Sequence, residues 1–346
     1  MPRASDTITV LESARAPTAR TNPYLPLLVA SFRPPVQARW FSWPGALFGS
    51  FDVFHLHWPE VRLLGRDRVR TLARSALFLL LLLRIRAQRK GLVRTLHNAV
   101  PHDELATGPA ALVRLCDRWT TAWITMSDLI SAPSSAGDVT VIPHGHYRGW
   151  FAHQPRSEPV PGRIVHMGLV RRYKGVDSLL RAFASIPDRD TSLRIVGATR
   201  DAALAAEIQD ACARDRRITA VDEYVPDDRL VREVTAGELV VLPFATVTNS
   251  GSLLLALSLD RPVLVPSQPM TEQLAAEVGP GWVFTYAGSL DPAALLDTLL
   301  AARRSGGGDR PNLSAREWDA IGVAHAVVFQ RAARAARRRP RGSQRL

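Results

Sequence analysis

The chain has 346 residues, enough for two domains that each bury a hydrophobic core. Its two cysteines, Cys116 and Cys212, are far apart in the sequence, which argues against a disulfide framework and a structural zinc site and favours a reducing compartment. The net charge of +12 suggests an anionic partner.

The positive charge is concentrated in two segments. Residues 61–90 contain nine Lys or Arg and one Asp, and residues 331–346 contain seven Arg and no acidic residue. No zinc-finger spacing or RNA-recognition aromatic motif accompanies this charge, so we expect no nucleic-acid partner. RNA binding by the arginine-rich tail stays an alternative.

The first basic segment surrounds an apolar stretch of eight residues, 76–83. A membrane span needs about 20 residues, so this stretch does not predict a transmembrane helix. It predicts a basic helix over 66–88, which either packs against a sheet or contacts the surface of an anionic bilayer.

Short apolar runs alternate with helical patterns through the first half of the chain. Residues 1–22 contain no apolar stretch of signal-peptide length, and we expect a disordered tail there. The expected strands are 25–30, 51–57, 92–96 and 139–143, and the expected helices are 66–88 and 109–125.

The pattern restarts after 151–162, a linker rich in proline. The expected strands are 163–167, 193–196, 239–242 and 263–265, with helices at 175–184 and 201–214 and a helix from about 253. We therefore predict an α/β protein with two doubly wound, Rossmann-like domains, and ligands at the carboxyl ends of the strands, in the cleft between the domains. The predicted divisions are a first domain at 23–155, a second at 156–312, a terminal helix at 313–330 and a basic disordered tail at 331–346.

The loop 166–175 reads HMGLVRRYKG and follows an expected strand. Gly168 permits close approach of the backbone to a ligand, and Arg171, Arg172 and Lys174 place cations beside a helix N-terminus. This combination suits a diphosphate; the alternative is a solvated basic turn.

Two strand ends in the first half carry polar side chains, in HLHWPE at 55–60 and TLHNAVPHDE at 95–104. These segments contribute His55, His57, Glu60, His97, Asn98, His102, Asp103 and Glu104. Such a cluster supplies a general base or hydrogen bonds to sugar hydroxyls. A metal site and a purely structural role are the alternatives, because H-x-H alone is a weak ligand signal.

The segment TNSGS at 248–252 leads into an apolar helix. Thr248, Asn249, Ser250 and Ser252 offer caps for the first N–H groups, and Gly251 permits close approach, so this helix N-terminus suits an anion. An ordinary capped helix is the alternative.

Taken together, these stretches resemble the GT-B-fold glycosyltransferases of the group 1 type. The carrying segments are GLVRRYKGVDSLLRAF at 168–183, DEYVPDDRLV at 222–231 and LVVLPFATVTNSGSLLLALSLDRPVLVPS at 239–267, with FDVFHLHWP and TLHN in the first half. The resemblance covers most of 25–300 and is stronger in the second half. It implies transfer of a sugar from a nucleotide diphosphate donor, held by the second domain, to an acceptor held by the first.

The resemblance also implies roles for individual residues. Lys174 matches the lysine that neutralises the donor diphosphate; the family's arginine usually stands where this chain has Leu169, so Arg171 or Arg172 substitutes. The remaining donor-binding residues that it implies are Gly168, Tyr224, Val225, Thr248, Asn249, Ser250, Gly251 and Ser252. The acceptor-binding residues expected in the first domain are His57, Trp58, Asn98 and His144.

One departure from the family pattern bears on the stereochemistry. Many retaining members carry two glutamates eight positions apart, where this chain has Val247 and Leu255. Their absence favours inversion, which requires a base to deprotonate the acceptor hydroxyl. The candidate catalytic bases are His97, Asp103 and Glu104.

The pattern is similar to bacterial exopolysaccharide and glycolipid glycosyltransferases, including β-mannosyltransferases, which makes GDP-mannose the first donor hypothesis. We expect no cofactor and no metal requirement. A cytoplasmic protein bound peripherally to the anionic inner face of the cell membrane, acting on a lipid-linked saccharide or exopolysaccharide precursor, fits these expectations. An inactive GT-B scaffold is the alternative.

Overall fold

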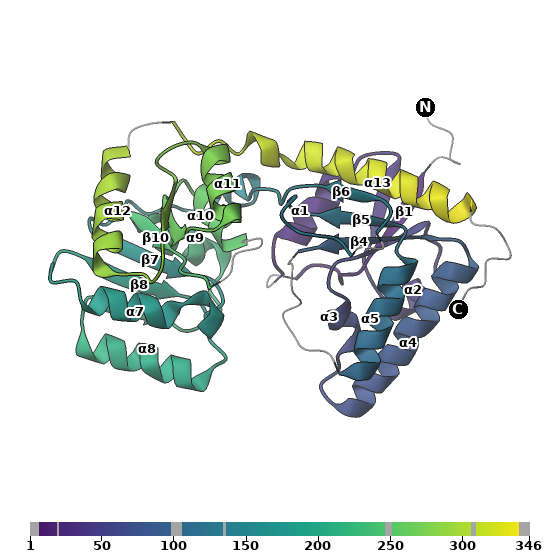
Figure 1. Cartoon of the computed structure of the whole chain (residues 1–346), viewed down its shortest axis with the longest axis horizontal. Helices are drawn as coiled ribbons and strands as arrows, with labels where there is room; N and C mark the ends of the chain where they lie inside the picture. Colours follow the sequence, from purple (N-terminus) through teal and green to yellow (C-terminus); the bar gives the residue numbers. More distant parts are fainter. Residues whose placement is uncertain are drawn as a thin grey trace. The chain divides into compact units, whose positions relative to one another are not determined.

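The computed structural model describes residues 7–18, 21–97, 106–133, 136–245, 251–305 and 309–338 (Figure 1). The chain forms two compact units. Unit 1 combines Met1–Gly145 with Arg316–Leu346, and unit 2 is His146–Ala315. The division after Gly145 lies ten residues before the end expected for the first domain at 155.

Unit 1 is built on a sheet of six parallel strands in the order β2-β1-β3-β4-β5-β6. The strands are β1 (Ile8–Glu12), β2 (Val36–Arg39), β3 (Val53–Leu56), β4 (Gly91–Leu96), β5 (Ala122–Thr125) and β6 (Val139–Val141). The registers pair Glu12 with His55 and His55 with Val93. The polar residues that end β1, β3 and β4 therefore meet at the carboxyl ends of the strands.

Helices cover both faces of this sheet, because successive strand residues point to opposite sides. Val10, Val53 and Val93 face α1 (Tyr24–Ser31) and α13 (Trp318–Arg338). Leu11, Phe54 and Leu92 face the other layer. That layer contains α2 (Trp43–Phe48), α3 (Pro59–Leu63), α4 (Arg68–Ala87) and α5 (Thr107–Trp119).

The last helix, α13, is part of the core of unit 1, and Figure 1 shows it (yellow) lying across the sheet beside α1. A Cβ atom at Gly322 would lie 2.3 Å from the carbonyl oxygen of Ser31, and one at Gly91 would lie 3.1 Å from the backbone of Ala332. Glycine at both positions allows the helix to approach α1 and β4 closely.

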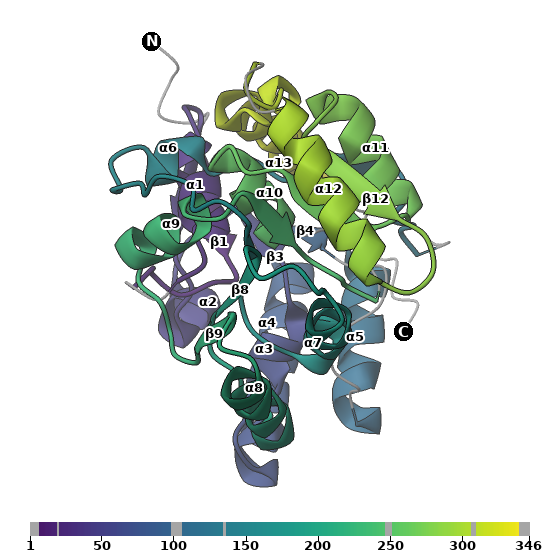
Figure 2. The same cartoon turned by 90° about the vertical axis from the view of Figure 1, so that its left-hand side faces the viewer.

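Unit 2 contains a second sheet of six parallel strands, in the order β12-β11-β10-β7-β8-β9. Its strands are β7 (Arg163–Met167), β8 (Ser192–Val196), β9 (Ile218–Val221), β10 (Leu239–Val241), β11 (Val263–Pro266) and β12 (Val283–Tyr286). Its helices are α6 (Arg148–Phe151), α7 (Val176–Ala184), α8 (Ala202–Arg214), α9 (Asp227–Thr235), α10 (Gly251–Ser258), α11 (Pro269–Val278) and α12 (Pro292–Ser305). Apolar residues of α7, α8 and α12 form one core with the strands, and Figure 2 shows α7 and α8 as neighbours.

Four expectations differ from the structure. The tail expected at 1–22 contains β1, and the strand expected at 25–30 is the helix α1. The helix expected at 109–125 ends at Trp119 and is followed by β5. The tail expected from 331 is helical as far as Arg338, because Ala332, Ala333 and Ala336 are buried against the sheet. Over the described residues, no helix is both long enough and apolar enough to cross a membrane.

Candidate functional site

In unit 2, three residues of the predicted donor site converge at the carboxyl end of β7. A Cβ atom at Gly168 would lie 3.0 Å from Ser252 Oγ and 3.2 Å from Lys174 Nζ. Gly168 directly follows β7, Lys174 ends a short 3-10 helix at Arg172–Lys174, and Ser252 lies in the first turn of α10. The loop 166–175 and the first turn of α10 therefore lie side by side.

Backbone conformation explains the two glycines of the first loop. Gly168 has a φ of +102° and Gly175 a φ of +69°, both in the region that side-chain-bearing residues rarely adopt. A Cβ atom at Gly175 would lie 2.1 Å from the carbonyl oxygen of Pro243. Gly175 thus turns the chain from Lys174 directly into α7 while the loop rests on the end of β10.

Lys174 is a partly buried cation in unfavourable electrostatic surroundings. Burial, and to a lesser degree the charge of Arg171, lower the pKa of Lys174 to about 8. Its Nζ lies 5.3 Å from the ring centroid of Phe244, and among the described residues no carboxylate pairs with Lys174 or Arg171. A bound anion would relieve both effects, so these two cations are suited to a phosphate.

The neighbouring Arg172 is directed elsewhere. Its guanidinium donates hydrogen bonds to Asp201 at 3.0 Å and to Glu207 at 2.8 Å, beside and on α8. Tyr224 and Val225 follow β9, which β8 separates from β7, and Tyr224 is half-exposed. The structure therefore groups Arg171, rather than Arg172, with Lys174.

The turn before α10 is only partly described. Thr248, Asn249 and Ser250 lie outside the described residues, as does Val247, one of the two positions where retaining relatives carry glutamate. Gly251 and Ser252 form the start of α10, and Leu255, at the second such position, is a half-buried residue of the same helix.

His166 is a buried residue of this region and is not one of the site residues predicted from the sequence. Its Nδ1–H donates to the carbonyl oxygen of Val241 at 2.9 Å, and in the described part of the chain its Nε2 has no partner. Burial, with a smaller contribution from Lys174, lowers the pKa of His166 to about 4, so the ring is neutral at pH 7.

In unit 1, a buried glutamate joins two of the predicted histidines. Glu12 Oε1 lies 3.1 Å from His55 Nδ1, and Glu12 Oε2 lies 3.2 Å from His57 Nε2. All three side chains are buried at the ends of β1 and β3. Thr95, on β4, continues the network, since its Oγ1 lies 2.8 Å from His55 Nε2.

His97, the described member of the predicted catalytic set, lies next to this network. Its Nε2 is 2.9 Å from His57 Nδ1, and its ring stacks on Trp58 with centroids 4.1 Å apart. Tyr24 contacts both His97 and His144, at centroid separations of 5.3 and 4.6 Å. The structure thus brings together His57, Trp58, His97 and His144, and it adds Glu12 and Tyr24. Asn98, His102, Asp103 and Glu104 lie outside the described residues.

Burial and neighbouring side chains shift the pKa values of the titratable groups in this site. Burial raises the pKa of the Glu12 carboxyl, but His55 and His57 outweigh it and the pKa falls to about 2. Burial lowers the pKa of His57 and of His144 to about 4, and it lowers that of His97 well below its ordinary value, with help from His57 and His144. At neutral pH the site therefore contains an anionic glutamate with neutral His57, His97 and His144.

Glu12, His55 and His57 also form, within the described residues, a donor set compact enough for a metal ion. The atoms that would bind the ion are those already joined by the two hydrogen bonds to Glu12. Each oxygen of the buried Glu12 carboxylate is paired with a histidine nitrogen. The observed arrangement is therefore complete as a hydrogen-bond network.

Comparison with known proteins shows the family to which the chain belongs. Residues 161–302 match the family model of the glycosyl transferases group 1. A protein of Xanthomonas campestris pv. campestris, named GDP-mannose:glycolipid 4-beta-D-mannosyltransferase, is 44% identical over 322 residues, which cover 93% of this chain and 92% of that protein. The chain is a group 1 glycosyltransferase. The relationship extends over both units of this glycosyltransferase.

Solved structures share the fold of the glycosyltransferase. Anabaena Alr3699/HepE, crystallised in complex with UDP, has a TM-score of 0.60 and 14% identity over 96% of this chain and 97% of that chain. Sucrose-phosphate synthase of Thermosynechococcus elongatus has a TM-score of 0.64 and 15% identity over 95% and 100%. The expectation of a GT-B fold with two doubly wound parallel sheets is confirmed.

Proposed function

We propose that this glycosyltransferase transfers mannose from GDP-mannose to a lipid-linked saccharide, a precursor of an exopolysaccharide or glycolipid. The observation that carries the proposal is the 44% identity, across 93% of the chain, to a protein named for that donor and for a glycolipid acceptor. A chain related along nearly its full length retains both substrate-binding halves.

Donor binding is assigned to unit 2. Lys174 and Arg171 neutralise the diphosphate, Gly168 lets it approach the backbone, and Ser252 with the N-terminus of α10 supplies hydrogen bonds. The arrangement of these groups at the carboxyl end of β7 supports the assignment, because nucleotides bind at that end of doubly wound sheets.

The proposed stereochemistry is inversion. GDP-mannose carries its sugar in α linkage, so a β-linked product requires attack from the opposite face. Leu255 in place of a glutamate and a nitrogen base in unit 1 are both consistent with this course. His97 is the proposed base among the described residues, and Asp103 and Glu104 stay candidates from the sequence.

The proposed reaction needs no metal ion. Lys174, Arg171 and the helix N-terminus supply the charge that stabilises the departing diphosphate. The sequence contains Asp188-Arg189-Asp190, two carboxylates in a D-x-D spacing. These residues precede β8 and so lie at the amino end of the sheet, opposite the end that carries Lys174.

Peripheral membrane binding is proposed through α4. Its inner face buries Phe78, Leu81, Leu82 and Ile85. A second apolar row, which we call the outer stripe, is exposed on the same helix with helical spacing, and it consists of Val69, Leu72, Ala76, Leu80 and Leu83. Leu72 is 73% exposed and Leu80 is 53% exposed.

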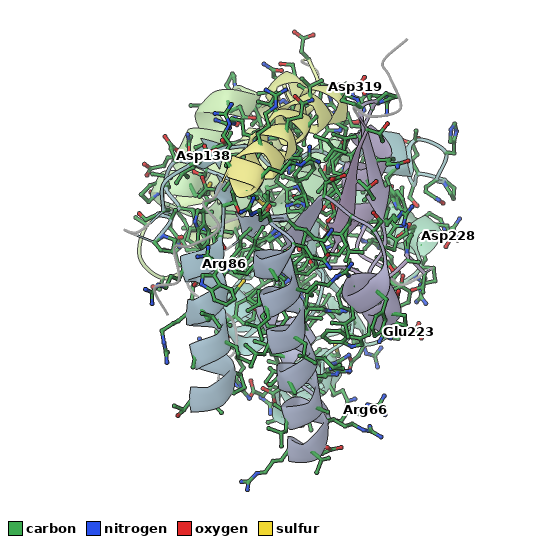
Figure 3. All side chains as sticks on the ribbon, turned by 90° about the vertical axis from the view of Figure 1, so that its right-hand side faces the viewer. Arg66, Arg86, Asp138, Glu223, Asp228 and Asp319 are labelled. Atoms are coloured by element: carbon green, nitrogen blue, oxygen red, sulfur yellow. The ribbon has the colours of Figure 1, made fainter. Side chains whose placement is uncertain are left out.

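Charge flanks the outer stripe. Arg66 and Arg68 are exposed at the start of α4, and Figure 3 shows Arg66 pointing away from the fold there and Arg86 nearer the other end. Exposed apolar side chains beside arginines suit an anionic bilayer surface, where the acceptor lipid would be anchored.

The decisive test supplies purified enzyme with GDP-mannose, GDP-glucose, UDP-glucose and UDP-galactose and a prenyl-diphosphate-linked oligosaccharide. The product anomer is then read from the one-bond C1–H1 coupling. We expect transfer from GDP-mannose and a β-linked product. Transfer from another donor and not from GDP-mannose would reject GDP-mannose as the donor. An α-linked product would reject the inverting course. A catalytically inactive scaffold, the alternative, is identified by absence of both transfer and calorimetric GDP binding.

A further inference from the structure

Glu12, His57 and His97 form a continuous line of hydrogen bonds that ends at a ring nitrogen. Glu12 Oε2 is 3.2 Å from His57 Nε2, and His57 Nδ1 is 2.9 Å from His97 Nε2. The other nitrogen, His97 Nδ1, receives no hydrogen bond from any described residue, and the ring retains 8% exposure. Glu12 and His57 are 0% and 3% exposed, so water is largely excluded from the inner part of the line.

Donor and acceptor chemistry fixes the direction of every bond in this line. An ionised carboxylate only accepts, so His57 Nε2 must carry the proton that it shares with Glu12. A neutral imidazole has one N–H, so His57 Nδ1 is then an acceptor, and the 2.9 Å contact requires the proton on His97 Nε2. By the same rule, His97 Nδ1 holds a lone pair.

We propose that Glu12 is a positioning residue for glycosyl transfer: acting through His57, it holds His97 in the tautomer whose Nδ1 lone pair accepts the proton of the acceptor hydroxyl. The inference rests on the proposed function, in which His97 is the base. Neither Glu12 nor His57 touches the reacting atoms in this role.

Glycosyl transfer couples the movement of a proton to His97 with the departure of GDP. The acceptor O–H bond breaks and its proton forms a bond to His97 Nδ1, while the acceptor oxygen forms the bond to C1 of the sugar. The bond between C1 and the diphosphate oxygen breaks, and its electron pair leaves with GDP. The imidazolium can pass its Nε2 proton to His57 Nδ1, which places the positive charge beside the Glu12 carboxylate.

A branch of the same network provides a matched control. His55 Nδ1 contacts the other carboxylate oxygen of Glu12, and His55 Nε2 contacts Thr95 Oγ1. This branch does not include His97. Thr95 is fully buried, like Glu12, and a valine there keeps its shape while removing the 2.8 Å contact with His55. A network that only stabilises the fold would respond similarly to loss of either end.

The titratable groups that face His97 come from several packed elements. They are His55 and His57 on and after β3, Tyr24 on α1, His144 after β6 and His325 on α13. Within the described residues, the negative charge that reaches this line comes from Glu12, through His57. Its removal should lower the basicity of His97 further.

The experiment combines spectroscopy and kinetics. In protein labelled with ¹⁵N-histidine, two-bond ¹⁵N–¹H correlation identifies which nitrogen of each ring is protonated, with the His97→Gln spectrum assigning the signal. We expect Nε2–H and an unprotonated Nδ1 for His97 at pH 7.5. An Nδ1–H tautomer would overturn the proposal.

Kinetics compare Glu12→Gln with Thr95→Val, using GDP-mannose and the prenyl-linked acceptor. Glu12→Gln should lower kcat about 100-fold with little change in KM for GDP-mannose, since general-base catalysis contributes roughly 10²–10⁴-fold. It should also move the acidic limb of the kcat/KM profile to lower pH. Thr95→Val should stay within about threefold of the parent in kcat, as expected for a hydrogen bond outside the relay.

The outcomes separate this inference from the function on which it rests. Absence of transfer from GDP-mannose by the parent enzyme rejects the proposed function. Transfer by the parent with unaltered kcat and pH profile in Glu12→Gln, or equal losses in Glu12→Gln and Thr95→Val, rejects the positioning role alone. Calorimetric GDP binding by each variant shows that unit 2 is intact.

Discussion

The Arg172 guanidinium lies 2.8 Å from the carboxylate of Glu207, whereas the adjacent Arg171 has no such partner among the described residues. The two arginines, equivalent in the sequence, therefore have different surroundings. We predict that Arg171→Ala and Lys174→Ala each weaken GDP binding by about tenfold to a hundredfold, because a charge-assisted bond to phosphate contributes roughly 1.5–3 kcal/mol. Calorimetric titration with GDP measures the effect.

Arg172→Ala is the matched control for that series and should change GDP affinity less than Arg171→Ala. Equal losses in both variants would mean that both arginines reach the diphosphate. Unchanged GDP affinity in both Arg171→Ala and Lys174→Ala would show that the loop at Gly168 does not bind the diphosphate.

A second prediction concerns metal ions. Enzyme dialysed against EDTA should retain full activity, since Lys174 and Arg171 provide the positive charge that a divalent ion would otherwise supply. Elemental analysis of the dialysed protein checks that Glu12, His55 and His57 hold no residual ion. Activity lost in EDTA and restored by manganese would contradict the prediction.

A third prediction addresses the outer stripe of α4. The double variant Leu72→Gln, Leu80→Gln should bind anionic vesicles at least about tenfold more weakly, because each buried leucine contributes roughly 1.5–3 kcal/mol when fully inserted. Vesicle co-sedimentation measures binding, and Leu300→Gln on α12, where Leu300 is 50% exposed, is the control. Equal binding by the parent and the double variant would exclude the stripe from the membrane contact.

The charged part of this surface is tested separately. Arg84 donates hydrogen bonds to the carbonyl oxygens of Ala46 and Gly49, so its replacement would disturb packing between α2 and α4. Arg66→Gln with Arg68→Gln avoids that disturbance, and it should reduce the salt dependence of vesicle binding, since such attraction is screened within about 10 Å at 0.1 M salt. Activity on a water-soluble acceptor should not change.

A fourth prediction concerns acid stability. His57 and His144 have a pKa of about 4 in the fold, and His325 has one of about 3, all below the ordinary 6.5. Between pH 6.5 and about 4 the unfolded chain therefore binds more protons, so the free energy of unfolding falls as pH falls. Each such histidine contributes up to about 1.4 kcal/mol per pH unit. Glu12 has a pKa of about 2 in the fold, below its ordinary 4.5, so its stabilising contribution to the free energy of unfolding is lost only as the pH falls below 4.5.

Urea unfolding at pH 7.5, 6.5 and 5.5, followed by tryptophan fluorescence, measures this slope. His325→Gln should flatten it, because His325 is buried with its Nε2 unpartnered in the described chain. His153→Gln, at an exposed position, is the control. A slope identical in the parent and His325→Gln would show that His325 does not contribute.

The alternation of strands and helices was predictable because parallel sheets demand it. His55, His57 and His97 were predictable as candidates because they stand at the ends of apolar runs. Two of the four expectations that differ from the structure have a clear physical reason. Residues 25–30 form a continuous apolar run too short to separate strand from helix by periodicity, and packing of α1 on α13 decides the outcome. Residues 8–12 fall within the tail expected at 1–22, although ITVLE, with its β-branched residues, is typical of a strand.

Glu12 ends this strand and is therefore absent from the predicted site residues. A carboxylate 43 residues before His55 gives no local signal of contact, and only the pairing of β1 with β3 brings the two together. The difference between Arg171 and Arg172 was equally out of reach, since it depends on Asp201 and Glu207 some 30 residues away. Spacing identifies candidate groups, whereas tertiary pairing decides which of them are available.

The position of α13 in unit 1 has a consequence for biosynthesis. The strands of unit 1 leave the ribosome first, yet the helix that covers one face of their sheet follows the whole of His146–Ala315. At about 5–20 residues per second, that delay lasts roughly 10–30 s. Until then Val10, Val53 and Val93 lack the side chains of Val328 and Phe329 that complete their core. Unit 2, continuous in the chain, can finish folding first, and nascent unit 1 has greatest need of chaperones during this interval.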